Sequence, residues 1–509
     1  MAQPRKQEKD FTAEVAALVP EVEGLAKDGK LIDAVEKITA MEKQTRNAAD
    51  MTSTATLLTT LATIIHSAGD LDMLNQQLTI MSKKHGQLKE AVVRMVDEAM
   101  KWLPALKEKK EKGEYKGGKD RWLELLNTLR DITEGKIYLE LARARLTLSL
   151  AEHHEKLSES APSEPSSPST AKSTSAEPEK KKEPTTARDH IDAAADLLSD
   201  IQVETYSSMD KREKTEFILE QMRLESMRGN WTKVRVGSRK VNRVYLKEED
   251  VSDLKLRFYD LIVQLALQDD DFLEACNAYQ AVWDTKRIKD DEAAERNVLE
   301  NIIIYVILAP YNNEQNDMLH KLYADSNLQN AETHYDLLKC FVTKELMRWP
   351  GIEELYGPKI RTSPVFAPDS DLGKKTGTNA EGKKPEELEK PGEWRWEQLH
   401  KRVVEHNIRV LASYYSRIHM SRLSELLDLP PLTTERTICK LVTDKTIFAR
   451  IDRPAGIVTF KKKRDANDVL NVWSTDIGKM LGLVEKASHL VSKEYAMHEA
   501  SKGGKGVKA

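Results

Sequence analysis

The stretch Gly377–Lys384 carries two glycines and a lysine at the spacing of a phosphate-binding loop. Such a loop holds phosphates with its backbone N–H groups and needs Ser or Thr directly after the lysine to hold magnesium. Here Lys384 and then Pro385 follow Lys383, and no apolar strand precedes the stretch. We therefore reject nucleotide binding at this stretch.

Histidine and cysteine, the usual ligands of zinc, occur without metal-ligand spacing. His153 and His154 are adjacent, so their side chains point about 100° apart on a helix and do not chelate one ion. We interpret them as solvated residues at a helix end. The cysteines Cys276, Cys340 and Cys439 are odd in number and far apart, which favours three buried thiols in a reducing compartment. With no HExxH or GxSxG motif, we expect no catalytic residue, no metal site and no cofactor.

The composition favours a mostly α-helical protein with polar inserts. Its 509 residues are 40% hydrophobic and 32% charged, with a net charge of −4. A nucleic-acid binder usually has a basic excess, which this chain lacks. No apolar run reaches the roughly 18 residues of a membrane span, and the N-terminus has no apolar core of a secretory signal. We therefore expect no membrane contact.

In the N-terminal third, apolar residues recur every three or four positions between turns of one type. Gly29-Lys30-Leu31, Gly69-Asp70-Leu71 and Gly135-Lys136-Ile137 share the order glycine, charged, apolar, and Gly229-Asn230-Trp231 and Asp270-Asp271-Phe272 look like degenerate copies. The first two lie 40 residues apart, which is the period of helix–turn–helix repeats. The pattern predicts a right-handed, tetratricopeptide-like solenoid. An irregular helical bundle remains the alternative.

Prolines should end two helices. An apolar stripe that reaches Leu103 is followed by Pro104, and a helix predicted from His334 to Trp349 is followed by Pro350-Gly351. Proline in a helix interior removes a backbone hydrogen bond, so we expect both helices to stop there.

From Trp394 the pattern changes to three helices and a hairpin. A long helix should contain Leu399 to Ile418, a short helix should stop at Pro430-Pro431, and Thr433 should cap the third. Ile447–Ile451 and Ile457–Phe460 then predict two β strands. This order is that of a winged helix.

Winged helices can bind DNA through their last helix. Here that helix carries Glu435, Arg436, Lys440, Asp444 and Lys445, a mixed set without a cluster to meet base edges. Nucleic acid is therefore disfavoured as a partner.

The C-terminal segment predicts a helix that packs against other helices. Its apolar residues alternate in steps of three and four: Leu470, Trp473, Ile477, Met480, Val484, Ala487 and Val491. Below, these seven residues are called the tail seam. Burying each large apolar side chain is worth about 1.5 to 3 kcal/mol, so an uncovered seam would forgo on the order of 10 kcal/mol. A partner bundle is the favoured solution, and folding back on the winged helix is the alternative.

The predicted organisation is mainly α: a helical-repeat solenoid, a winged helix and a long C-terminal helix. Its segments are N-terminal helical repeats (1–157), a disordered Ser/Pro/Lys insert (158–188), further helical repeats (189–360), a flexible Gly/Lys/Pro loop (361–393), the winged helix (394–464), the C-terminal helix (465–498) and a disordered tail (499–509).

Helical repeats that lead into a winged helix and an apolar tail helix resemble the PCI-domain proteins. The similarity is most specific at 306–315, 345–349, 402–409, 426–429 and 445–457, and there it points to the PCI subunits of the proteasome regulatory-particle lid. Two alternatives remain: the paralogous PCI subunit of the COP9 signalosome, and a winged-helix nucleic-acid-binding protein.

The resemblance implies structural work in the cytoplasm and nucleus, without catalysis. Winged helices of such subunits pair side by side, here through Ile447, Phe448, Ile451, Ile457 and Phe460, and their C-terminal helices form one bundle, here through the tail seam. The implied partners are other PCI subunits of the lid, its metalloprotease-fold subunits and the ATPase ring. No homo-oligomer is implied.

Overall fold

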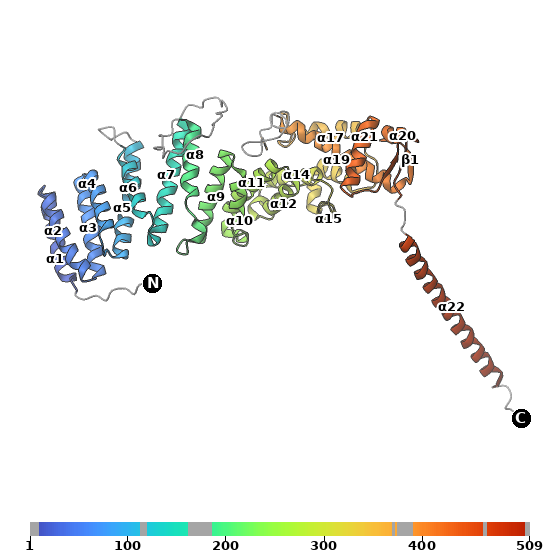
Figure 1. Ribbon diagram of the computed structural model, residues 1–509, viewed down its shortest axis with the longest axis horizontal. Helices are drawn as coiled ribbons and strands as arrows, with labels where there is room; N and C mark the ends of the chain where they lie inside the picture. The colour runs from blue at the N-terminus through green and yellow to red at the C-terminus, as the bar shows by residue number, and fades with distance from the viewer. Residues whose placement is uncertain are drawn as a thin grey trace. The chain divides into compact units, whose positions relative to one another are not determined.

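The computed structural model describes residues 10–111, 120–160, 186–368, 372–373, 390–461 and 466–503. The chain divides into two compact units. The first comprises Met1–Ile302 with Asp371–Pro391, and the second comprises Ile303–Ser370 with Gly392–Ala509. Most of the described residues are helical (Figure 1), so the predicted mainly α fold is confirmed.

The first unit is a succession of helices, most of which pack against helices one or two places away in the sequence. They are α1 (Thr12–Lys27), α2 (Leu31–Asn47), α3 (Met51–Ala68), α4 (Leu71–Lys83), α5 (Lys89–Glu111), α6 (Arg121–Thr133), α7 (Glu140–Ser160), α8 (Ala187–Ser199), α9 (Lys211–Arg228), α10 (Trp231–Lys240), α11 (Ser252–Asp269), α12 (Phe272–Trp283), α13 (Lys286–Lys289) and α14 (Glu292–Leu308), the last of which ends in the second unit. Short 3₁₀ helices lie at Ile137–Leu139, Val203–Thr205, Tyr245–Lys247 and Glu249–Val251. The apolar faces of α1 to α7 form a common core that includes Leu57, Leu74 and Leu126.

The turns predicted from sequence share one backbone conformation. Gly29, Gly69, Gly135, Gly229 and Asp270 have φ angles between 62° and 83°. This left-handed region carries no steric cost for glycine, and Asp tolerates it better than most residues do. The helix ends predicted at these five positions are therefore confirmed.

The two helix ends predicted from proline were wrong. Pro104 lies inside α5, where Leu103 and Leu106 on either side are buried in the core. Their packing holds the helix together across the lost backbone hydrogen bond. Pro350 lies in the first turn of α17 (Trp349–Ile360), where a missing N–H leaves no helical bond unmade.

The second unit begins in α14 and holds the predicted winged helix. Its further elements are α15 (Asn313–Ala324), a 3₁₀ helix (Ser326–Asn330), α16 (Glu332–Val342), α17, α19 (Pro391–Tyr414), β1 (Arg417–His419), α20 (Met420–Leu427), α21 (Pro431–Thr443), β2 (Arg450–Asp452), β3 (Ile457–Thr459) and α22 (Ala466–Gly503). α16 ends at Val342 and a loop follows it up to α17, so the helix predicted to reach Trp349 is shorter than expected. Val365 and Phe366, which we expected in a flexible loop, are buried.

The winged helix has three strands where the sequence predicted two. The antiparallel sheet has the order β1-β3-β2, and Ile418 of β1 pairs with Val458 of β3. The prediction that Ile418 belongs to the long helix was therefore wrong. A single apolar residue fits both the helical period of about 3.6 residues and the strand period of 2. Thr433 does not cap α21, which begins at Pro431 with Pro430 as its N-cap residue.

α22 begins close to its predicted start and continues past its predicted end at 498, to Gly503. The predicted Ser/Pro/Lys insert overlaps the ends of α7 and α8, and its residues 161–185 lie outside the described part of the chain. The phosphate-loop-like stretch 377–384 also lies outside it.

Candidate interaction surfaces

Within the described ranges, no group of three or more His, Cys, Asp or Glu is placed to hold a metal ion. A search of the described helices for one long and apolar enough to cross a membrane finds none.

We expected His153 and His154 to be solvated, but both are half-buried and contact other rings. The ring of His153 packs 5.0 Å from that of Trp122, and burial, followed by the nearby Lys110 ammonium, lowers the His153 pKa to about 4. His154 faces His190 of α8, with 3.3 Å between their Nδ1 atoms. These rings join α7 to its neighbours, a structural role.

The three cysteines differ in burial, so the expectation of three buried thiols was wrong. Cys276 is buried, and desolvation raises its pKa to about 12. Cys340 is half-buried beside the Tyr356 hydroxyl, 3.9 Å away. Cys439 is exposed in α21.

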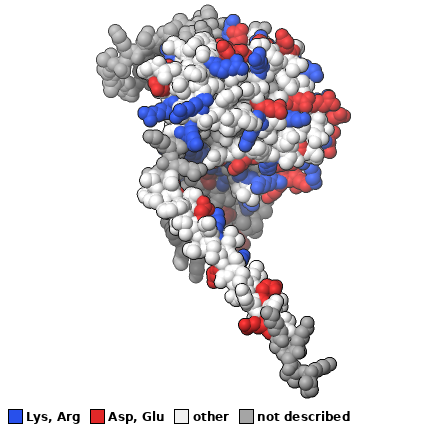
Figure 2. Space-filling model, turned by 90° about the vertical axis from the view of Figure 1, so that its right-hand side faces the viewer, with Lys and Arg blue, Asp and Glu red and all other residues white. Residues whose placement is uncertain are grey.

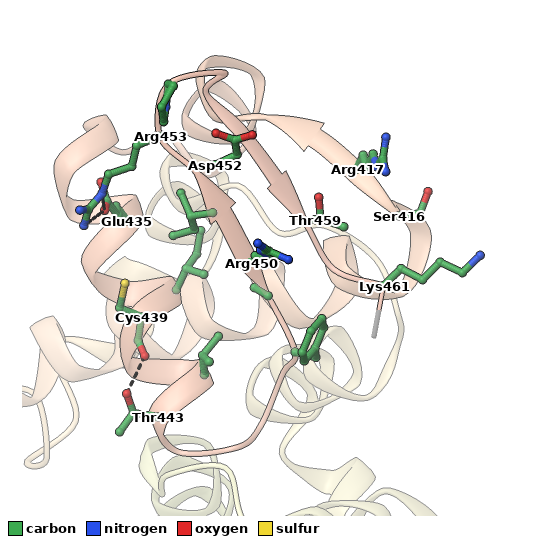
Figure 3. A pocket seen from close by; sticks show the side chains of 16 residues that line it. Ser416, Arg417, Glu435, Cys439, Thr443, Arg450, Asp452, Arg453, Thr459 and Lys461 are labelled. Atoms are coloured by element: carbon green, nitrogen blue, oxygen red, sulfur yellow. Dashed lines mark hydrogen bonds and ion pairs between the residues drawn. The ribbon is translucent and has the colours of Figure 1, made fainter. Parts of the chain in front are cut away.

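A hollow in the second unit lies between α21 and the winged-helix sheet. It encloses about 1330 Å³, and residues of α21, β1, β2 and β3 line it. Ile438, Val442, Phe448 and Pro454 supply apolar lining. We call this hollow the wing groove (Figure 3).

Three cations on the outer face of the sheet form part of the lining of the wing groove. Arg417 and Arg450 are both directly opposite Thr459, one on each side of it. Directly opposite residues of an antiparallel pair point to the same face. Lys461 follows two residues after Thr459, and Figure 3 shows the three cationic side chains around the threonine. We call Arg417, Arg450 and Lys461 the basic row.

The predicted pairing residues of the hairpin differ in accessibility. Phe448 is 43% exposed and lines the wing groove. Ile457 is half-buried on the outer face of β3, while Ile447 and Ile451 are half-buried against the winged-helix core. Phe460 is only 6% exposed and belongs to that core. It supports the sheet from within, so we remove it from the predicted contact surface.

The predicted tail seam lies on a helix whose described side chains are all exposed. Trp473 is 63% exposed, Met480 69% and Val484 60%. Figure 2 shows α22 with uncharged side chains over most of the visible face. Further apolar residues border the seam and are equally exposed: Val469, Leu483, Leu490 and Met497. The spacing of three and four residues that predicted the seam does not include these four residues.

Two of the stretches that carry the family resemblance meet at α19. Arg402 donates from Nε to the carbonyl oxygen of Leu308, at 3.1 Å, and from Nη1 to the buried carboxylate of Glu405, at 2.5 Å. The Arg409 guanidinium lies 4.0 Å above the centre of the Tyr311 ring. The end of α14 is thus fixed to the helix that leads into the winged helix.

Comparison with known sequences accounts for most of the chain. Residues 33–291 match the family described as PSMD12/CSN4, N-terminal, residues 331–462 match the PCI domain, and residues 467–499 match the 26S proteasome regulatory subunit RPN5 C-terminal domain.

Two relatives are similar along nearly their full length. The 26S proteasome regulatory subunit rpn501 of Schizosaccharomyces pombe is 37% identical over 97% of this chain and 98% of its own length. The 26S proteasome non-ATPase regulatory subunit 12 of Dictyostelium discoideum is 36% identical over 97% of this chain and 96% of its own length. The COP9 signalosome complex subunit 4 of Drosophila melanogaster is 22% identical over 43% of this chain and 46% of its own length.

Proposed function

The chain belongs to the family of 26S proteasome regulatory subunits that includes RPN5 and non-ATPase regulatory subunit 12, and on this premise we propose that it is a structural subunit of the proteasome regulatory-particle lid. It scaffolds assembly of the lid and so supports ubiquitin-dependent protein degradation, and it performs no catalysis itself. Full-length similarity favours this function over that of a COP9 signalosome subunit, which the chain resembles over less than half its length.

The observation that carries the proposal is the exposed apolar face of α22. The tail seam alone holds six large apolar side chains and Ala487, and each large one is worth about 1.5 to 3 kcal/mol when buried. A monomer with this face in water would forgo that stabilisation. A bundle formed with the C-terminal helices of other lid subunits covers it, because apolar residues in steps of three and four form a stripe along one side of a helix.

The winged helix supplies the second proposed contact. β2 is an edge strand, because β3 is the only one of the described strands that pairs with it. An edge strand offers unpaired backbone groups to a neighbouring chain. Phe448, which is 43% exposed, and the half-buried Ile457 lie beside it. We therefore keep these two residues, with Ile447 and Ile451 as their support, as the proposed site of side-by-side pairing with another PCI subunit.

The proposed partners are other PCI subunits of the lid, its metalloprotease-fold subunits and the ATPase ring. The chain contributes one copy to this assembly, in the cytoplasm and nucleus, without membrane or nucleic acid. Its role toward the metalloprotease-fold subunits is to position them.

Removal of α22 tests the proposal. The full chain and a version that ends at Lys461 are expressed with an affinity tag, and the complexes that co-purify are identified by mass spectrometry. We expect proteasome lid and ATPase subunits with the full chain and their loss with the truncated chain, which keeps its helical circular dichroism. Signalosome subunits without proteasomal ATPases, or normal assembly of the truncated chain, would contradict the proposal.

A further inference from the structure

We propose that the basic row binds an acidic segment of a partner protein laid along the winged-helix sheet. The inference rests on the proposed function only in that the partner is expected to be a neighbouring subunit. It starts from the cross-strand register. Arg417 and Arg450 flank Thr459 on one face, so three adjacent strands, about 4.8 Å apart, carry two like charges on either side of a hydroxyl.

The three cations of the basic row outnumber the one carboxylate of Asp452, which shares the outer face of β2 with Arg450. Arg417, Arg450 and Lys461 are exposed, and none forms an ion pair with another residue of the described part of the chain. Nearby Arg453 shows the contrast, because Glu435 of α21 accepts from both its Nε and its Nη2, at 2.8 and 2.7 Å. Like charges gathered on one face repel one another, so an anionic group from outside gains attraction from all three.

The surroundings of the basic row favour a polypeptide over a nucleic acid. The adjoining wing groove is lined by apolar side chains, among them Phe448, which is 43% exposed. The edge strand β2 borders the same groove and can accept an additional strand. Side chains of such a strand point alternately to its two faces. One face then presents Asp or Glu to the basic row, and the other presents apolar residues to the groove.

The position of Glu435 also favours a polypeptide. Glu435 of α21 lines the wing groove, and its carboxylate would repel a phosphate backbone. An acidic and apolar peptide segment can turn its apolar side chains toward α21 and keep its carboxylates on the outer face of the sheet, at the basic row.

The proposal is tested in the assembly purified through the full chain. A carbodiimide joins the Lys461 amine to a carboxylate in direct contact, and mass spectrometry identifies the cross-linked peptide. We expect a cross-link from Lys461 to Asp or Glu of another subunit. The double substitution Arg417→Glu with Arg450→Glu should lower the amount of that subunit recovered about tenfold at about 50 mM salt. The difference should shrink at about 200 mM salt, where screening weakens exposed charges.

A matched control carries Arg436→Glu with Lys445→Glu, two exposed cations of the same winged helix that do not line the groove. It should assemble normally. The neutral pair Arg417→Gln with Arg450→Gln should show an intermediate loss, which keeps the test valid where charge reversal impairs folding. Normal recovery in both double variants, or no intersubunit cross-link at Lys461, overturns the proposal. A gel shift of duplex RNA or DNA that depends on Arg417 and Arg450 overturns it in favour of nucleic acid.

The outcome is separable from that of the proposed function. Loss of the C-terminal bundle after truncation at Lys461 supports the lid assignment whatever happens at the basic row. If the full chain recovers no proteasome subunit, the lid assignment fails, and a cross-link from Lys461 to an acidic segment of another protein still supports the inference.

Discussion

Asn407 pairs with both backbone groups of Met347, which lies 60 residues earlier in the chain. The side-chain amide of Asn407 donates to the Met347 carbonyl oxygen at 2.6 Å, and its side-chain oxygen accepts from the Met347 N–H at 2.9 Å. Both residues are buried. These two hydrogen bonds hold the loop between α16 and α17 against α19, with one donor and one acceptor on each side, as in a pair of β strands. Both partners lie in stretches by which the family resemblance was identified.

The substitution Asn407→Ala should open this loop. It leaves a buried N–H and a buried carbonyl of Met347 without partners, and each such group costs about 1 to 3 kcal/mol. We expect hydrogen exchange of the peptide 343–349 to accelerate by a factor of about ten or more, with α14 and α15 unchanged. Asn313→Ala, at an exposed position in the same unit, serves as the control. Equal exchange in the two variants would contradict the role of Asn407.

Gly392 should not tolerate a side chain. A Cβ atom added there would clash with the carbonyl oxygen of Ala367 and lie 3.1 Å from that of Phe366. The backbone must move to relieve this contact, which displaces the buried Phe366 side chain. We expect Gly392→Ala to lower the stability of the second unit by about 2 kcal/mol, measured by urea denaturation. In Gly351→Ala the new methyl group meets no atom within 4 Å, so that variant should keep its midpoint.

Acid should destabilise the packing around His406. This ring is 6% exposed and packs 5.5 Å from the Phe341 ring. Burial, followed by the charge of Arg409, lowers its pKa from 6.5 to about 4. The unfolded chain therefore takes up this proton at higher pH than the folded chain does. Stability is fully present above about pH 6.5 and falls as the pH drops toward 4, by about 3 kcal/mol in total.

The substitution His406→Leu should remove this part of the pH dependence. The measurement is urea denaturation of both proteins at pH 7.5, 6.0 and 5.0, where the wild type should lose stability faster. His320→Gln, on the exposed side of α15, should leave the slope at its wild-type value. A parallel decline in the wild type and His406→Leu would show that the proton binds elsewhere.

The sequence was sufficient for the repeated turns and for the helices, because glycine at a left-handed position and apolar residues every three or four positions are local signals. It was not sufficient for β1. That strand has three residues, and Ile418 is buried only because it pairs with Val458, 40 residues later. Pro104 was misjudged for a similar reason, since distant packing holds α5 together across it.

Of the candidate surfaces, one could be predicted from the sequence and the other could not. The tail seam follows from spacing alone, whereas the basic row exists only in the folded chain. Nothing in the segments around Arg417 and Arg450 indicates that they meet on either side of Thr459. The burial of Phe460 is also a tertiary property, because the same alternation fits a contact residue or a core residue.

α22 should contact more than one partner helix. Leu483 and Leu490 each precede a residue of the tail seam and are 66% and 60% exposed. In a two-stranded coiled coil these flanking positions usually carry charges. Here they widen the apolar surface beyond what one partner helix covers. We therefore expect Leu483→Glu and Leu490→Glu to reduce recovery of the lid as strongly as Met480→Glu, by about tenfold or more each.

The control for this prediction is His489→Glu, because residue 489 lies about 100° from residue 490 around the helix, on the side away from the seam. All four variants should keep the helical circular dichroism of the wild type, since the isolated α22 buries none of these side chains. If Leu483→Glu and Leu490→Glu assemble normally while Met480→Glu does not, a single partner helix covers the seam. A loss in all three with normal assembly of His489→Glu places α22 between at least two neighbours, because one packed helix cannot cover both the seam and its flank.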